Sequence, residues 1–165
     1  MATPFVVELV TPERVLFSGE VEEVSLRTDE GEIAFLAHHE DFIGALDITV
    51  CKLTPASGGE DTQPVLAAIH GGFVHVDDSG VKLLAGVAEL GSEIDVARAR
   101  AALTAAESQV PGEPAASHGD ELAADGEGAI ARSPAMLALL EPEAPAQVAR
   151  RARVRLEAAG ETLGN

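Results

Sequence analysis

The stretch Gly86-Val-Ala-Glu-Leu-Gly-Ser-Glu-Ile-Asp-Val-Ala-Arg-Ala-Arg100 marks a change in the spacing of apolar residues along the chain. Before it, short runs of Val, Ile, Leu and Thr are separated by turn residues at intervals of about 8–12 positions, which is typical of an all-β sandwich or barrel. After it, apolar residues recur at spacings of three and four, which indicates an amphipathic helix. The sequence therefore predicts two parts joined at this stretch: a β-sandwich domain over residues 1–90 and a helical hairpin over residues 91–165.

The N-terminal part predicts a series of short strands joined by tight turns. Asp77-Asp-Ser-Gly80 predicts a hairpin turn, because Asp and Gly accept the positive φ that such turns need, and Ser57–Asp61 predicts a second, longer one. His70 and His75 are an odd number of positions apart, so they are expected to face opposite sides of one strand as ordinary sheet residues. The expected strands are Phe5–Val10, Val15–Val24, Ser25–Thr28, Glu32–Leu36, Ile43–Ile48, Thr49–Leu53, Pro64–Ile69, Gly72–Val76 and Val81–Ala85.

The C-terminal part predicts two helices, over about residues 93–110 and 147–159, with narrow apolar stripes that favour an antiparallel pair. Ser92-x-x-Asp95 fits a capping box at the start of the first helix. Gly160 is a natural stop for the second helix. Between the helices, residues 111–146 form a connection of unusual length, rich in Gly, Pro and acidic residues, which is typical of a flexible linker.

The composition excludes several classes of function. With 28 acidic and 11 basic residues, the chain carries a formal net charge of −17, which would repel nucleic acid and anionic lipid headgroups. The single Cys51 excludes an internal disulfide, and its setting in an apolar run predicts a packed thiol rather than a nucleophile. The N-terminus has neither a basic segment nor a long apolar run, so no signal peptide or membrane span is expected.

No catalytic or metal-binding residue is predicted. The chain has no Walker loop, no Gly-x-Ser-x-Gly elbow and no His-Glu-x-x-His motif, so the usual hydrolase signals are missing. The group His38-His39-Glu40-Asp41 is interpreted as a turn, because adjacent side chains on an extended backbone point apart and cannot share a metal.

Two pairs of charged residues are the sharper candidates for a site. Asp95 and Arg98 border the stripe of the first expected helix, and Arg151 and Arg155 border that of the second, so these edges meet in an antiparallel hairpin. One interpretation is structural: a cap and ion pairs, each worth ~0.2–0.5 kcal/mol on an exposed helix. The other is an anion site, because guanidinium groups bind phosphates through paired N–H donors and a carboxylate accepts hydrogen bonds from a sugar or base. The residues alone leave both interpretations open.

Four blocks of sequence, in this order and spacing, resemble the epsilon subunit of bacterial F-type ATP synthase. They are Thr28–His39, His70–Val76, Val81–Glu89 and Ile94–Ala99. The resemblance implies an α+β fold, with a flattened antiparallel β-sandwich followed by an antiparallel helical hairpin. It further implies a non-catalytic subunit of a proton-translocating enzyme, on the cytoplasmic face of the bacterial cell membrane. This subunit is a monomer within the complex, docks on the gamma subunit and the c-ring as part of the central stalk, and couples proton flow to ATP synthesis. Its hairpin reaches the alpha/beta catalytic head and inhibits ATP hydrolysis.

The resemblance also implies particular residues. It implies that the protein requires no cofactor. It also implies a regulatory ATP site, which would be formed by Glu89, Ile94, Asp95, Arg98, Ala99, Arg151 and Arg155. Contact with the rotor ring falls on Gly31, Glu32, His38, His39, Glu40 and Asp41. The chain departs from the family pattern in two places: Ala34-Phe-Leu-Ala-His-His39 replaces the usual Gly-x-x-Pro-Gly-His, and the segment 112–146 is longer than the family's usual turn.

Three hypotheses follow. The chain is an inhibitory rotor subunit, whose arginines on the second helix meet an acidic surface of the catalytic head or else pair within the hairpin. Alternatively, it is a stand-alone ATP-sensing protein, with the hairpin as a lid. The third hypothesis is a purely structural stalk adaptor, whose hairpin does not regulate.

Overall fold

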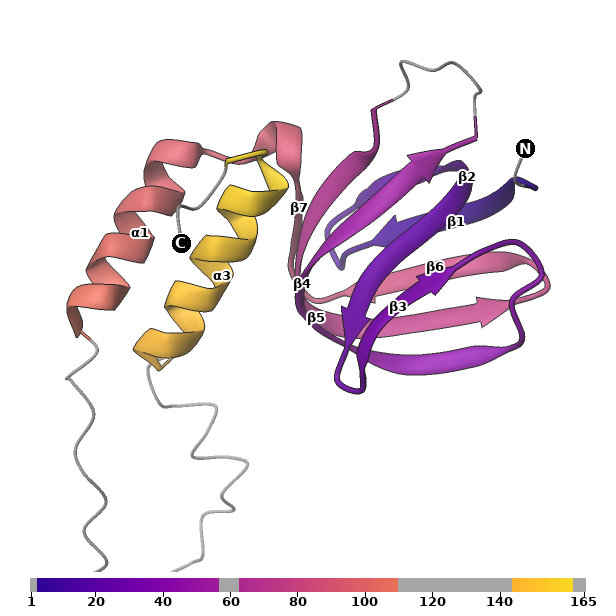
Figure 1. Ribbon diagram of the computed structural model, residues 1–165, viewed down its shortest axis with the longest axis horizontal. Coiled ribbons are helices and arrows are strands. Elements are labelled where there is room, and N and C mark those ends of the chain that lie inside the picture. Colours follow the sequence, from indigo (N-terminus) through magenta and orange to yellow (C-terminus); the bar gives the residue numbers. More distant parts are fainter. Residues whose placement is uncertain (1–2, 57–62, 110–143, 162–165) are drawn as a thin grey trace, which may run out of the picture.

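The computed structural model describes residues 3–56, 63–109 and 144–161 of the 165-residue chain. Figure 1 shows a β-domain with a pair of helices beside one end of it. The fold class predicted from the sequence, a β-sandwich followed by a helical hairpin, is confirmed. The predicted turn at Ser57–Asp61 and residues 111–143 of the predicted linker lie outside the described residues.

The described residues of the β-domain form a seven-stranded sheet. Three of the strands, β2, β4 and β5, each join two segments that the sequence pattern separates, and the short β7 is not predicted by that pattern. The hairpin turn predicted at Asp77–Gly80 is confirmed, because Asp77 on β5 pairs with Gly80 on β6. The strands are β1 (Phe5–Val10), β2 (Val15–Thr28), β3 (Gly31–Phe35), β4 (Phe42–Pro55), β5 (Val65–Asp77), β6 (Gly80–Ala85) and β7 (Ala88–Leu90).

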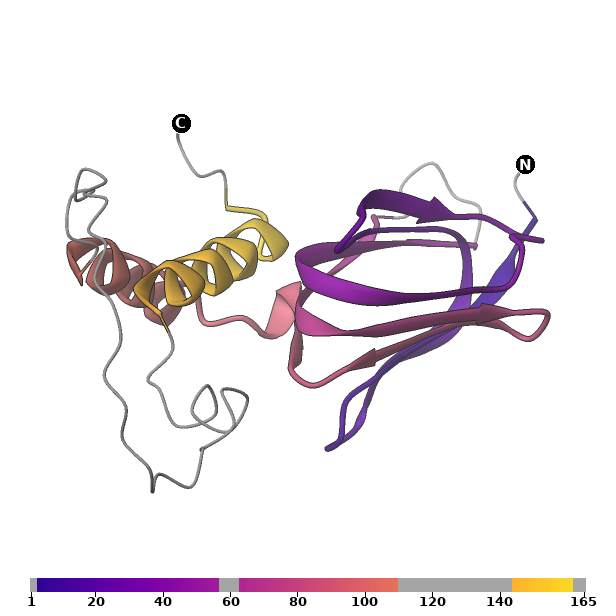
Figure 2. The ribbon, with the colours of Figure 1, turned by 90° about the horizontal axis from the view of Figure 1, so that it is seen from below.

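The sheet closes on itself. The strand order is β1-β6-β5-β4-β2-β3, and β1 also pairs with β2, while β7 pairs with β5. Figure 2 shows the strands in two facing layers. All the pairings are antiparallel except that of β1 with β6, which is parallel. The predicted antiparallel sandwich therefore contains one parallel pair, which brings the first and sixth strands together.

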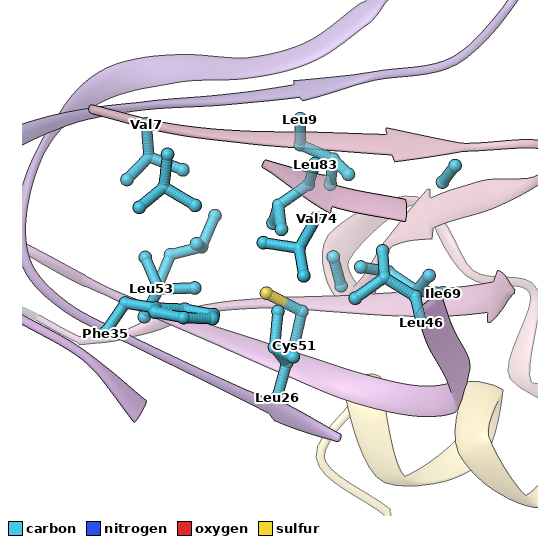
Figure 3. Close-up of a cluster of buried hydrophobic side chains, with 14 of the residues drawn as sticks. Val7, Leu9, Leu26, Phe35, Leu46, Cys51, Leu53, Ile69, Val74 and Leu83 are labelled. Carbon is cyan, nitrogen blue, oxygen red and sulfur yellow. The ribbon is translucent and has the colours of Figure 1, made fainter. Parts of the chain in front are cut away.

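The core between the layers consists of aliphatic side chains and Phe35 (Figure 3). Val7, Leu9, Leu53 and Leu83 are fully buried there. Cys51 is fully buried among them, and this burial raises the pKa of its thiol to about 12. The prediction of a packed rather than a reactive cysteine is consistent with this position.

Strand β5 changes face half-way along its length. Ile69 and, five positions later, Val74 are both fully buried in the core, so the inward and outward alternation shifts by one residue between them. The pair Gly71–Gly72 lies at this point with φ of 89° and 143°, a backbone that residues with a side chain rarely adopt. As a result His70 and His75 both lie outside this core, and the prediction that they face opposite sides is wrong.

The C-terminal part contains a 3-10 turn, η1 (Gly91–Glu93), and two helices, α1 (Val96–Gln109) and α3 (Pro145–Ala158). The predicted capping box is wrong: Ser92 lies in η1, and the carboxylate of Asp95 caps α1 by accepting a hydrogen bond from the Arg98 N–H at 3.0 Å. The helices are antiparallel, because Arg100 pairs with Glu161 and Arg153 pairs with Glu107.

Helix α3 lies between α1 and the β-domain in Figure 1 and packs against β4 and β5. A second apolar cluster joins the two parts, with Val154 and Leu156 of α3, Ala68 of β5 and Ile94 at the start of the hairpin. Neither helix of the described residues is long and apolar enough to cross a membrane.

Candidate functional site

A cavity of about 180 Å³ lies where β7, η1, the first turn of α1 and the end of α3 meet. Six of the seven residues that the family resemblance places in an ATP site line it, and they come from segments up to 66 positions apart. Arg151 is the exception, because it lies one turn before Arg155 on α3. The lining residues are Glu89, Glu93, Ile94, Asp95, Arg98, Ala99, Ala102 and Arg155.

The short connection between the two parts holds these residues together. Ile94 and Ala99 are buried in the apolar cluster below the cavity, so they fix the start of α1 against α3. Gly91 allows the end of α3 to approach: a Cβ atom on Gly91 would lie 2.1 Å from the carbonyl oxygen of Ala158. The cavity therefore exists only while the hairpin is docked on the β-domain.

An ion pair between Arg155 and Glu89 crosses one wall of the cavity. The Nε and Nη2 atoms of Arg155 both donate to Oε1 of Glu89, at 2.9 and 2.7 Å. The pair is partly buried, and charge-assisted hydrogen bonds of this kind are stronger than neutral ones. It ties the last turn of α3 to the edge strand β7.

The other carboxylates of the cavity also have donors. Glu93 accepts from Arg14 of the β1–β2 turn at 2.5 Å, and Asp95 caps α1. Among the described residues Arg98 forms no ion pair, so its exposed guanidinium is the cation of the cavity that is available to an anionic group. Drug-sized ligand pockets measure about 300–1,000 Å³. A nucleotide would therefore be only partly enclosed, with its remaining atoms in solvent.

A second ion pair ties α3 to the β-domain away from the cavity. Arg150 donates to Asp47 of β4 at 2.5 Å. Burial by itself raises the pKa of Asp47, but hydrogen bonds from Arg150 and from the Ile48 N–H outweigh it and hold that pKa below its usual value. Arg150, Arg153 and Arg155 each have an acidic partner within the docked hairpin and sandwich. In this state the arginines of α3 therefore form ion pairs within the chain, the alternative to their meeting an acidic surface of the catalytic head.

His70 lies beneath α3, close to the same ion pairs. Its side chain is 8% exposed, and neither ring nitrogen has a hydrogen-bond partner among the described residues. Burial, and then the charges of Arg155 and Arg151, lower the pKa of His70 to about 4, and Glu89 opposes them. The sequence pattern predicts an ordinary strand position for His70. The adjacent Gly71–Gly72 pair is the local signal of the change of face that places it here.

The residues assigned to rotor contact lie in two places. Gly31 and Glu32 begin β3, and Glu32 lines a groove of about 750 Å³ beside α3, together with Arg150 and Glu157. His38 and His39 follow the other end of β3 and line a separate cavity of about 290 Å³ with the Asp77–Gly80 turn. A five-residue strand spans roughly 17 Å, so the six residues do not form one continuous surface.

The turn predicted at His38–Asp41 lies one residue earlier, at Ala37 and His38, where the His39 N–H donates to the carbonyl oxygen of Leu36 at 3.2 Å; residues 39–41 have no regular structure. His38 has a φ of 62°, which is uncommon for a residue other than glycine. The ring of His39 packs edge-on against Phe35, with ring centroids 4.9 Å apart. No group of three or more metal-ligating side chains occurs among the residues that the structure describes.

The closed sheet with a hairpin docked on its outer face defines a class of small two-part proteins, a β-sandwich with a C-terminal pair of helices. Residues 4–91 match the β-sandwich domain of the ATP synthase delta/epsilon chain. The ATP synthase epsilon chain of Syntrophomonas wolfei is 40% identical over 106 residues, which cover 64% of this chain and 74% of that one. The epsilon chain of Thermobifida fusca is 44% identical over 108 residues, covering 65% and 77%. The chain belongs to the ATP synthase epsilon chain family, as the sequence blocks predicted.

Solved structures share the fold at lower identity. A chain in the mitochondrial ATP synthase of Euglena gracilis superposes with a TM-score of 0.55 at 23% identity, covering 93% of this chain and 76% of that chain. A chain in the central stalk and c-ring of the Tetrahymena thermophila enzyme gives 0.51 at 15% identity, covering 96% and 98%. At these identities the likeness concerns the fold.

Proposed function

We propose that this chain is a non-catalytic stalk subunit of a proton-translocating ATP synthase. It docks on the gamma subunit and the c-ring at the cytoplasmic face of a bacterial membrane. Its hairpin is docked on the sandwich in the state seen here, and it extends into the alpha/beta catalytic head to inhibit ATP hydrolysis. Membership of the epsilon chain family supports this role.

One observation on the β-domain carries the proposal: an apolar strip on its outer face. Phe73 on β5 lies opposite Ala45 on β4 and Leu84 on β6, and Ile43 is two positions from Ala45 along β4. Ile43, Phe73 and Leu84 are 73%, 60% and 49% exposed. Contiguous apolar side chains on the surface of a water-soluble domain mark a protein interaction site, and this strip is the proposed gamma-docking surface.

The end of the sandwich that lies away from the hairpin is the proposed c-ring contact. His38 and His39 line the 290 Å³ cavity there together with the Asp77–Gly80 turn, and Glu40 and Asp41 follow them in the sequence. The unusual backbone of His38 supports a functional role, because such conformations cluster at binding sites. Glu32 lies in the groove beside α3 instead, and it and the preceding Gly31 are left out of this contact.

The test of docking is a charge placed on the strip. Phe73→Glu is expected to lower co-purification of this chain with the gamma subunit at least tenfold, because an unpaired carboxylate would be buried in the interface. Val15→Glu is the matched control, since Val15 is similarly exposed but lies outside the strip. Equal retention of the two variants would contradict the proposed surface.

The cavity favours a further function, the binding of ATP as a regulatory ligand. The convergence of six predicted residues on one cavity supports it. In isothermal titration of ATP into the full chain, Arg98→Ala is expected to weaken binding by ~10–100-fold, because a hydrogen bond to a charged group contributes about 1.5–3 kcal/mol.

Arg100→Ala is the control, because Arg100 lies two positions further on α1 and pairs with Glu161 outside the cavity. Absence of heat with the unmodified chain, or equal losses for Arg98→Ala and Arg100→Ala, would contradict the ATP site.

A further inference from the structure

His70 lies in the interface that holds the hairpin on the sandwich. It is two positions from Ala68 on β5, and Ala68 packs in the cluster that contains Val154 and Leu156 of α3. The His70 N–H donates to the carbonyl oxygen of Val87 at 3.0 Å, so the backbone is fixed at this point. The imidazole is 8% exposed, and both its nitrogens are enclosed without a hydrogen-bond partner among the described residues.

The charged groups that face this ring come from two elements. Helix α3 brings the guanidinium groups of Arg151 and Arg155, and β7 brings the carboxylate of Glu89. Strand β4 contributes no charge at this position, because the residue opposite His70 in the register is Ile48. Glu89 already accepts two hydrogen bonds from Arg155. A proton on His70 would therefore add a further positive charge beside a carboxylate that already binds Arg155.

Protonation of His70 is less favourable when α3 is docked on the sandwich than when α3 is released from it. While α3 is docked, the ring is neutral, because a buried imidazolium without an acceptor and beside two guanidinium groups is unfavourable. When α3 leaves the sandwich, the cover and both guanidinium groups leave with it, and water solvates either form of the ring. We propose that His70 couples docking of the hairpin to pH, and that acidification releases α3 from the sandwich.

The direction and size of the effect follow from linkage. In the docked state burial, and then Arg155 and Arg151, lower the pKa of His70 to about 4, against an ordinary value of 6.5. The contribution of His70 to docking is fully present above pH 6.5 and is lost as the pH falls from 6.5 towards 4. The ratio of docked to released hairpin therefore falls about tenfold between pH 7.5 and pH 5.5.

This release has a consequence for the enzyme that rests on the proposed function. If the released hairpin is the inhibitory form, acidification of its compartment shifts the subunit towards inhibition of ATP hydrolysis. The coupling of His70 to docking does not depend on that step. It can be measured on the full chain in isolation, where neither gamma nor the catalytic head is present.

The experiment follows the distance between the two parts as a function of pH. Cysteines introduced at the exposed positions Glu13 and Ser108 carry a fluorescent donor and acceptor, while the buried Cys51 stays unlabelled because its thiol is protonated. In the chain with its native histidines, the ratio of docked to released hairpin is expected to fall about tenfold between pH 7.5 and 5.5. His70→Gln is expected to show no such change. His75→Gln is the control and is expected to retain the pH response, because the ring of His75 on the same strand is partly exposed.

Proton NMR of the His70 ring in the unsubstituted chain gives a second measurement that needs no variant. A docked hairpin with a His70 pKa well below 6.5 supports the proposal. A His70 pKa near 6.5, constant energy transfer from pH 7.5 to 5.5, or a pH response that survives in His70→Gln would overturn it. None of these outcomes changes the expected co-purification with gamma, so failure here is distinct from failure of the stalk function.

Discussion

Single residues at the junction of the two parts decide whether the hairpin can dock. Gly91 is the clearest, because the position that its Cβ would occupy lies only 2.1 Å from the carbonyl oxygen of Ala158 and 3.3 Å from that of Leu66. Both of these atoms belong to the backbone, so neither can rotate away as a flexible side chain would. Docking of α3 therefore depends on the absence of a side chain at one position.

Gly91→Ala tests this dependence. We expect it to cost about 1–3 kcal/mol, as overpacking does elsewhere, and we expect that cost to fall on docking rather than on the sandwich. In hydrogen exchange, protection of the amides in α3 is lost while that of β5 and β6 is kept. Gly86→Ala is the control, because no atom lies within 4 Å of the Cβ position of Gly86. Equal protection of α3 in the two variants would show that the approach at Gly91 is not required.

At the scale of elements, the sequence predicts where strands and helices exist better than where they end. At two of the three places where the pattern divides a continuous strand, the inward and outward alternation shifts by one residue: near Asp47 on β4 and at Gly71–Gly72 on β5. The sequence shows this change of alternation. It does not show that the strand's hydrogen bonds continue past the change, because they depend on a partner strand more than 20 positions away. Helix α1 begins at Val96, about three residues later than the sequence predicts, because η1 intervenes and Asp95 caps the helix.

The candidate site shows the same limit. The motif from Ile94 to Ala99 could be placed from the sequence, because its residues are adjacent and α1 brings them to one side. Resemblance to the family added Glu89 and Arg155, which the structure brings to the same cavity. The position of His70 could not be predicted, since it depends on the change of face in β5 and on the packing of α3 against that strand.

At the scale of the whole molecule, a strongly acidic chain holds its basic helix by charge as well as by apolar contact. The formal net charge is −17, and α3 carries four of the 11 Lys and Arg residues. Arg150 and Arg155 tie it to Asp47 and Glu89 of the β-domain. The apolar part of the contact consists of a small cluster of Ala, Val, Leu and Ile side chains. The proposed extension of the hairpin requires these ion pairs and this apolar cluster to separate.

Asp47→Asn tests whether opening controls the enzyme. The asparagine amide keeps an oxygen that can accept from the Ile48 N–H, but it lacks the charge that binds Arg150. The ion pair is partly exposed: the side chain of Arg150 is 47% exposed and that of Asp47 is 26% exposed. After discounting for solvent screening, the lost pair corresponds to ~0.2–1 kcal/mol of docking, or up to about a fivefold shift towards the released hairpin. If the released hairpin inhibits, ATP hydrolysis by the reconstituted complex is expected to fall by up to the same factor, and more at low ionic strength, where charges are less screened. Glu13→Gln, at an exposed position of the β1–β2 turn, is expected to leave the rate unchanged. A rate that rises with Asp47→Asn, in a complex that retains the subunit, would mean that the docked hairpin is the inhibitory state.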